Sequence, residues 1–301
     1  MPQRGITEVR FGLYCLGCLP GFHLPFLAGA SPEGVFAEHG LDVEILEPPP
    51  GGGVDSVRRT AEGGTDFCLT SVGYYLQARA QVADLAARFI AVVGRRSPMA
   101  GLVAAGSALE APADLGGRRV GAMPGDGLAA EYEGALAEHG IAAPVRVPVP
   151  YADAPAALAR GEIDVVADFA DLLPRARRWS GIEMRAIPVG VAHYANGVVA
   201  GDHVPDEHVE AMGAAVSAAL EHQRAAPSTG LENLIARCPD IEPADALEGW
   251  SIGERTIFGA DAPGSMDHAA WEATIAYTAG VHGVPAVPAG SVYRSRQHSR
   301  T

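Results

Sequence analysis

The sequence of 301 residues contains no lysine, because all 22 of its basic residues are arginine. Without a lysine amine the chain cannot form an internal Schiff base, which excludes pyridoxal-phosphate or aldolase chemistry on a protein lysine. The Gly-Lys-Ser/Thr motif of P-loop nucleotide-binding proteins is excluded for the same reason. Neither Gly-x-Ser-x-Gly nor His-Glu-x-x-His occurs, so the best-known hydrolase and metallopeptidase motifs are also missing.

Cysteine and long apolar runs are scarce as well. The four cysteines are too few for a disulfide scaffold in a chain of this length. The first ten residues lack the apolar stretch of a signal peptide, and no run reaches the ~18 apolar residues of a membrane span. We therefore expect a cytoplasmic protein with reduced thiols and no membrane insertion.

Positive charge is outweighed by negative charge, with a net charge of −14. Nucleic acids and anionic membranes both need a clustered positive surface, so neither is an expected partner. Hydrophobic residues make up 48% of the chain, which is enough to bury a sizeable core. The length corresponds to about two domains of ~150 residues.

The first half of the chain alternates strands and helices. We expect strands at residues 9–14, 42–46, 66–69 and 88–93. We expect helices at 54–62 and 71–81, and another helical stretch that ends near Gly40. This alternation predicts βα units and a largely parallel sheet. In the tail we expect four helices, at residues 206–226, 231–238, 244–254 and 266–283. We expect this helical tail to pack back on the first lobe.

Two motifs recur in the same order about 100 residues apart. Ala37-Glu-His-Gly-Leu41 returns as Ala137-Glu-His-Gly-Ile141, and Gly63-x-x-Asp66 returns as Gly161-x-x-Asp164. Either match alone is weak, since many helix–Gly–strand units look alike, but two in order indicate an internal repeat. We predict two α/β lobes with a ligand cleft between them. Lobe 1 would comprise residues 1–93 and 190–301, and lobe 2 residues 94–189.

These motifs, together with Asp114-Leu-Gly-Gly-Arg-Arg-Val-Gly121, resemble the type II periplasmic-binding-protein fold. The resemblance covers roughly residues 7–201. Within that fold the sequence is most similar to the branch of sulfonate, taurine and pyrimidine solute-binding proteins and the thiamine-pyrimidine synthase. Gly21-Phe-His-Leu-Pro25 resembles the first-loop signature of that branch.

The synthase chemistry itself is not expected. The resemblance implies a lysine and a histidine four residues apart after the third strand, and cysteines near the return crossing. This sequence has Thr70 and Tyr74 at the first two positions, and residues 191–196 contain no cysteine. We therefore predict no pyridoxal cofactor, and more generally no cofactor and no metal.

Loops at the carboxyl ends of the strands are expected to line the cleft. We predict His23 as a general base, with Tyr74 or Asp168 supplying a proton. The predicted ligand-binding residues are Tyr14, Cys15, Cys18, Phe22, Thr70, Ser71, Met123, Asp126, His193, Tyr194 and Asn196.

Several of these candidates also have a purely structural interpretation. Cys15-x-x-Cys18 followed by His23 could hold a metal or act as a redox pair, but free cysteines are usually buried packing residues. Asp126 and Asp168 could simply cap the helices that follow them. The acidic and histidine-rich run at residues 202–208 is predicted to be a solvated capping region rather than a metal site.

Two classes of function fit this sequence. The main hypothesis is a cytosolic enzyme that uses acid/base groups without a cofactor for elimination, decarboxylation or cyclisation of a small biosynthetic substrate. The aromatic residues of the predicted cleft favour a planar substrate. The alternative is the substrate-binding component of an ABC importer, for which a permease would be a partner, or a cytosolic protein that senses or sequesters its ligand.

Overall fold

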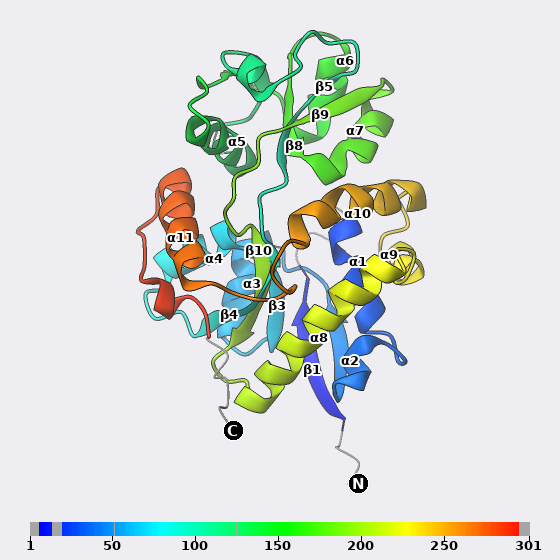
Figure 1. Ribbon diagram of the computed structural model, residues 1–301, viewed down its shortest axis with the longest axis vertical. Coiled ribbons are helices and arrows are strands. Elements are labelled where there is room, and N and C mark those ends of the chain that lie inside the picture. Colours follow the sequence, from blue (N-terminus) through cyan, green and yellow to red (C-terminus); the bar gives the residue numbers. More distant parts are fainter. Residues whose placement is uncertain (1–5, 14–19, 51, 125, 295–301) are drawn as a thin grey trace.

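The computed structural model describes residues 6–13, 20–50, 52–124 and 126–294, which form two α/β lobes (Figure 1). The sheet of the first lobe has the strand order β2-β1-β3-β10-β4. Its strands are β1 (Thr7–Gly12), β2 (Leu41–Leu46), β3 (Phe67–Ser71), β4 (Ala87–Gly94) and β10 (Asn196–Gly201). The helices of the first half are α1 (Pro20–Gly29), α2 (Val35–Glu38), α3 (Gly52–Ala61) and α4 (Val72–Gln81). The predicted two-lobed α/β fold is thus confirmed.

The second lobe has a three-stranded sheet in the order β8-β5-β9 and a two-stranded sheet of β6 and β7. Its strands are β5 (Met99–Ala104), β6 (Arg119–Gly121), β7 (Val145–Val147), β8 (Val166–Phe169) and β9 (Met184–Pro188). Its α-helices are α5 (Gly127–Glu138), α6 (Ala154–Ala159) and α7 (Leu173–Ser180). Three short 3₁₀ helices complete it: η1 (Pro112–Leu115), η2 (Tyr151–Asp153) and η3 (Ala170–Leu172).

The expectation of a largely parallel sheet is wrong for the strands that follow a crossing between the lobes. β1 pairs in parallel with β2 and β3, but β10 is antiparallel to β3 and β4, and β5 is antiparallel to β8 and β9. A strand that arrives from the other lobe starts where its neighbours end, so it must run in the opposite direction. In register, Asn196 lies opposite Ser71, and Met99 lies opposite Phe169. The antiparallel entry therefore brings these residues to the edge that faces the other lobe.

The two crossings, residues 95–98 and 189–195, lie side by side. The Ser97 amide donates to the Val191 carbonyl at 3.1 Å. A Cβ on Gly190 would lie only 1.9 Å from the Ser97 carbonyl oxygen, so the close approach of the two crossings requires glycine there. Paired crossings of this kind give the lobes a common hinge.

The repeated Gly-x-x-Asp motifs have the same structural role in both lobes. The Asp66 carboxylate accepts from the Arg10 backbone amide at 2.7 Å and from its guanidinium at 3.0 Å. Asp164 accepts from the Arg119 amide at 2.9 Å and from its guanidinium at 2.7 Å. Each aspartate thus fixes the start of its own strand to a strand of the same lobe. The internal repeat predicted from the sequence is visible as a repeated ion pair.

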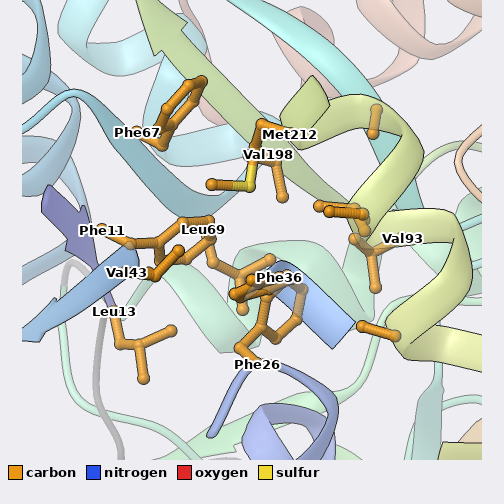
Figure 2. Close-up of a cluster of buried hydrophobic side chains, with 14 of the residues drawn as sticks. Phe11, Leu13, Phe26, Phe36, Val43, Phe67, Leu69, Val93, Val198 and Met212 are labelled. Carbon is orange, nitrogen blue, oxygen red and sulfur yellow. The ribbon is translucent and has the colours of Figure 1, made fainter. Parts of the chain in front are cut away.

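One face of the first sheet is covered by α1, α2 and the long tail helix α8 (Asp206–Ala225). Figure 2 shows the apolar cluster between them, in which the rings of Phe11 and Phe26 stack at 5.4 Å. Met212 of α8 and Val198 of β10 belong to the same cluster, and both are fully buried. The opposite face of the sheet is covered by α3, α4 and the last tail helix. Trp271 of that tail helix is fully buried in the apolar cluster between them.

The other tail helices are α9 (Leu231–Arg237), α10 (Pro243–Ile257) and α11 (His268–His282), followed by η4 (Ala289–Ser291). The tail packs on the first lobe, and α10 and α11 also contact the second lobe. α10 lies against α1, where a Cβ on Gly21 would come within 2.6 Å of the Trp250 amide. On its other side α10 contacts η3, with Gly253 packed against Asp171. The tail therefore connects the lobes in addition to the two crossings.

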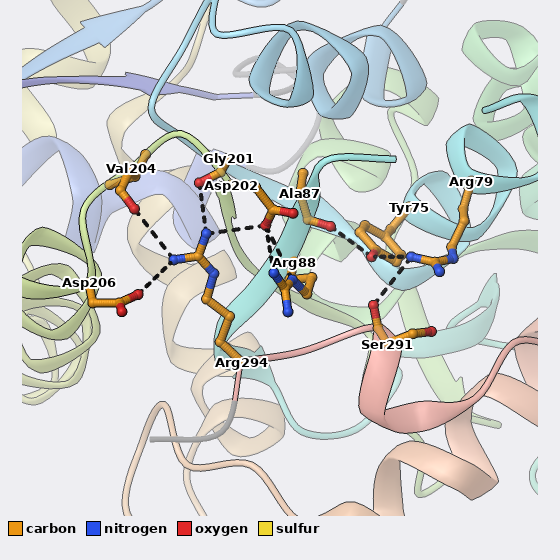
Figure 3. Close-up of polar contacts among 10 residues, drawn as sticks. All are labelled: Tyr75, Arg79, Ala87, Arg88, Gly201, Asp202, Val204, Asp206, Ser291 and Arg294. Atoms are coloured by element: carbon orange, nitrogen blue, oxygen red, sulfur yellow. Dashed lines mark hydrogen bonds and ion pairs between the residues drawn. The ribbon is translucent and has the colours of Figure 1, made fainter. Parts of the chain in front are cut away.

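The acidic and histidine-rich run at residues 202–208 anchors the end of the described chain. Figure 3 shows the Arg294 guanidinium donating to Asp202 at 3.2 Å and to Asp206 at 3.3 Å. Arg88 donates to the same Asp202 oxygen at 3.1 Å. Throughout the described residues there is no group of three or more metal-ligating side chains. The aspartates of this run act as ion-pair partners for arginine.

Candidate functional site

A cavity of about 500 Å³ lies between the two lobes. The first lobe contributes the start of α4, the start of β10 and the end of α11, and the second lobe contributes the start of α5, η2 and the end of β8. Both crossings border it through Ser97 and Val191. Because the walls belong to different lobes, a hinge motion at the crossings changes the width of the cavity.

The start of α4 forms one wall. Ser71 caps the helix, its hydroxyl accepting from the Tyr74 amide at 3.1 Å, while the Val72 amide donates to the Ala195 carbonyl at 2.9 Å. The Tyr74 ring lies across Gly53, where a Cβ would come within 2.0 Å of the ring. Burial raises the pKa of the Tyr74 phenol, and the nearby carboxylates of Asp126 and Glu131 raise it further.

The start of α5 faces α4 across the cavity. The Asp126 carboxylate caps this helix, accepting from the Leu128 amide at 2.9 Å and the Ala129 amide at 3.3 Å. The capping role considered for Asp126 from the sequence is therefore confirmed, and the same residue also lines the cavity. A capping carboxylate places a negative charge where the helix dipole is positive.

Asp168 lies at the end of β8, with only 3% of its surface exposed. Its oxygens accept from the Tyr151 hydroxyl at 3.0 and 3.2 Å and from the Phe169 amide at 2.9 Å. The Arg175 guanidinium donates to the same hydroxyl and lies 4.0 Å from the Asp168 carboxylate. Burial raises the pKa of Asp168 to about 6, and the charge of Arg175 opposes that rise. Asp168, Tyr151 and Arg175 thus form a buried network at the cavity wall.

A third wall joins α11 of the first lobe to α5 of the second. The His193 and Tyr277 rings stack with their centroids 4.5 Å apart. His193 Nε2 lies 3.7 Å from Glu138, and His282 Nε2 lies 3.4 Å from Glu131. These contacts link the lobes at the rim of the cavity, so they must change when the lobes move apart.

The floor of the cavity is formed by residues 194–196, where the second crossing enters β10. Tyr194 is buried, its amide donating to the Thr274 hydroxyl at 3.0 Å and its own hydroxyl accepting from the Asp267 amide at 3.0 Å. Asn196 is 7% exposed and lines the cavity beside it. An amide and a phenol held in fixed positions suit a floor that orients a small ligand.

The chain matches the NMT1/THI5 like family model over residues 22–228. It belongs to the NMT1/THI5-like family. Among curated protein sequences, none matches this chain.

Solved structures show the same fold at low sequence identity. The periplasmic aliphatic sulphonate binding protein SsuA from Escherichia coli aligns with a TM-score of 0.71 at 16% identity, covering 96% of this chain and 92% of that one. The alkanesulfonate-binding protein SsuA from Xanthomonas axonopodis pv. citri, bound to MOPS, aligns with a TM-score of 0.66 at 16% identity, covering 97% and 99%. A Candida albicans protein with the generic periplasmic binding protein fold aligns with a TM-score of 0.57 at 14% identity, covering 96% and 92%. The NMT1/THI5-like chain therefore has the fold of periplasmic binding proteins.

Seven of the residues predicted for the cleft of this NMT1/THI5-like protein line the cavity. They are Ser71, Tyr74, Asp126, Asp168, His193, Tyr194 and Asn196. They come from both lobes, so the structure brings the two halves of the predicted site together.

Four other predicted residues are described but do not line the cavity. Phe22 and His23 lie inside α1, where Phe22 is part of the apolar core and His23 is fully buried. Thr70 is fully buried in β3, and Met123 is 42% exposed ahead of α5. Residues 20–29 form a helix packed in the core, which removes the predicted base from the cavity wall. Tyr14, Cys15 and Cys18 lie outside the described residues.

Several lining residues of the NMT1/THI5-like cavity were missed by the sequence analysis. Gln77 is three residues after the predicted Tyr74, so helical periodicity places it on the cavity face. That signal was available in the sequence. Glu131 of α5 had no such signal, since no predicted residue lies three or four positions before it. Tyr277 and His282 come from the tail helix α11, and no local pattern links this helix to a cleft between repeated lobes.

Proposed function

We propose that this protein is the substrate-binding component of an ABC-type importer for a small molecule. The observation that carries the proposal is the cavity of about 500 Å³, whose walls come from two lobes connected by a paired crossing. A volume of this size encloses a small organic ligand, and hinge closure around it is a signal that a permease can recognise. The fold neighbours named as periplasmic and sulfonate-binding proteins support the same function.

The enzyme hypothesis is less well supported than this alternative. It relied on His23 as a base at the cleft, and His23 is fully buried in α1 rather than in the cavity lining. Asp168 faces the cavity, but its oxygens are already held by Tyr151 and by a backbone amide. Asp168 could take a proton from a ligand only by giving up one of these contacts.

We expect native mass spectrometry of the freshly purified protein to detect one small molecule per chain. After release, addition of that molecule should reduce the radius of gyration measured by small-angle X-ray scattering, because the lobes close. The recovered molecule should be chemically unchanged after hours of incubation. A steady change in its mass would contradict the receptor function and favour an enzyme.

A cavity-filling variant tests whether this molecule occupies the interlobe cavity. Gly127 lines the cavity, and a Cβ there meets no atom within 4 Å, so Gly127→Trp introduces bulk without local strain. We expect it to weaken ligand binding by more than about tenfold, or about 1.4 kcal/mol. Gly106→Trp is the matched control, since its Cβ also meets nothing within 4 Å and Gly106 is exposed outside the cavity lining. Equal affinity of both variants would locate the ligand elsewhere.

Location in the cell gives a second test. Within the described residues, no helix is long and apolar enough to cross a membrane. The sequence analysis expects a cytoplasmic protein, whereas an importer receptor has to meet its ligand outside the cytoplasmic membrane. We therefore expect fractionation of the native cells to recover the protein outside the cytoplasm. Complete retention in the cytoplasm would instead favour a ligand sensor with the same cleft.

A further inference from the structure

The lining of the interlobe cavity carries more negative than positive charge. Among the described residues that line it, Asp126, Glu131 and Asp168 carry carboxylates and none is arginine, and the chain has no lysine. The other ionisable nitrogen groups of the lining are the imidazoles of His193 and His282, which lie beside Glu138 and Glu131. An anionic ligand would therefore meet three carboxylates and no permanent positive charge.

Arginines close to the cavity lining are already engaged or face solvent. Arg146, whose charge interacts with that of Asp126, is paired with Glu133. The Arg175 guanidinium donates to Tyr151 and lies against Asp168. Arg95 is paired with Asp261 at 2.5 Å and also donates to Ser265. Arg96 is exposed and does not contribute to the lining. Recruiting Arg95 or Arg175 for an anion would break contacts that stabilise the fold.

Backbone amides at the two helix N-termini that border the cavity are already bound by side chains of the protein. Free amides at a helix N-terminus are a common binding site for anions. Here the α5 amides of Leu128 and Ala129 are bound by the Asp126 carboxylate, so the protein supplies its own anion at that position. At the start of α4 the Ser71 hydroxyl accepts from the Tyr74 amide. A sulfonate would have to displace Asp126 or lie beside its charge.

Aromatic rings are a second feature of the cavity that favours a cationic ligand over an anionic one. Tyr74, Tyr151, Tyr194 and Tyr277 all line the cavity. Burial raises the pKa of the Tyr74 and Tyr277 phenols, and the nearby carboxylate of Glu131 raises both further. Aromatic faces attract cations, and neighbouring carboxylates strengthen that attraction. Rings and carboxylates together form a surface that suits a positively charged group.

We propose that the cleft takes a small organic cation with an amine or quaternary ammonium group, and that Asp126 and Glu131 select against sulfonates. The proposal rests on the receptor function proposed above and names its class of ligand. The cation lies between Tyr74, Tyr277 and the two carboxylates, where it restores charge balance to the cavity. The solved sulfonate-binding neighbours share the fold, so the charge of the cleft rather than its architecture decides the ligand.

Two probes with the same ring test this charge selectivity. Benzyltrimethylammonium and benzenesulfonate are titrated into the full-length protein by isothermal calorimetry, after removal of any bound ligand. We expect the cation to bind at least about tenfold more tightly than the sulfonate, because like charges placed side by side are costly in a shielded site.

Three variants assign the effect to residues. Glu131→Gln should weaken binding of the cation about tenfold, and Asp126→Ser, which keeps a capping side chain, should shift selectivity toward the sulfonate by a similar factor. Glu110→Gln is the control, because Glu110 is an exposed carboxylate of the same lobe that lies outside the cavity lining. Thermal unfolding of each variant shows that it is folded.

Each outcome decides the question. Tighter binding of the cation that is reduced by the two cavity variants and not by the control supports the proposal. Tighter binding of benzenesulfonate overturns the class of ligand and leaves the receptor function intact. Failure of both probes to bind at millimolar concentration also overturns it, whereas the receptor function depends separately on the ligand that co-purifies and on lobe closure.

Discussion

Asp171→Asn is expected to stabilise the folded protein at pH 8 and to leave its stability near pH 4 almost unchanged. Asp171 lies in η3 of the second lobe and is 7% exposed. Its side chain packs against Gly253 of α10, and its Oδ1 atom is buried without a hydrogen-bond partner among the described residues. Burial raises the pKa of Asp171 from 3.8 to about 7, and repulsion from Asp168 adds to the rise.

The direction of the pH effect follows from this raised pKa. A carboxyl group that binds its proton more tightly in the folded state contributes stability below pH 4, where it is neutral in both states. That contribution is lost as the pH rises from 4 through 7, because the unfolded chain ionises first. A pKa change from 3.8 to about 7 corresponds to about 4 kcal/mol, and we expect a difference of about 2–4 kcal/mol at pH 8.

The measurement is the free energy of unfolding in urea at several pH values for both proteins. The gain of Asp171→Asn over the unmodified chain should grow between pH 4 and pH 7 and then level off. The control is Asp84→Asn, since Asp84 is exposed and hydrated in both states. A gain for Asp171→Asn that is the same at every pH would mean that ionisation of this buried group is not its cause.

Trp271→Ala is expected to cost about 3–5 kcal/mol of folding free energy, a large part of the 5–15 kcal/mol of a typical domain. Trp271 of α11 is fully buried. Its ring lies 4.9 Å from Phe89 of the sheet, stacks on Tyr293 at 5.9 Å, and meets Tyr194 edge-on at 5.2 Å. Removing it leaves a cavity where the last tail helix is attached to the first lobe.

The same substitution should also weaken ligand binding, because Tyr194 forms the floor of the interlobe cavity. Guanidinium unfolding measures the first effect, and calorimetry with the co-purified ligand measures the second. Trp271→Phe should cost less than about 1.5 kcal/mol, since the ring contacts are largely kept. Ile6→Ala, at a residue 67% exposed in the first lobe, is the surface control. A loss for Trp271→Ala no larger than that of the control would contradict its proposed role.

Local sequence patterns were sufficient for the first four strands and for the tail helices, while no ranges were predicted for the elements of the second lobe. The helix predicted at residues 71–81 appears as α4 (Val72–Gln81), which Ser71 caps. The four tail helices lie within a few residues of their expected ranges. These features depend on caps, turn residues and periodicity, all of which act over a few neighbouring residues. The two Gly-x-x-Asp motifs belong here too, since the aspartate of each one binds an arginine of the same lobe.

What the sequence determined by itself is the two-lobed α/β fold and the absence of lysine chemistry; what only the tertiary structure decided is which side chains share the cavity. Helix and strand positions follow largely from local propensity, and composition follows from counting, whereas strand order and the antiparallel entry of β5 and β10 depend on the crossings between the lobes. The position of His23 inside a core helix, and of Tyr277 and His282 at the cavity, depends on how α1 and α11 pack against distant elements. Such packing is set by burial of apolar surface summed over the whole chain, which no short motif encodes.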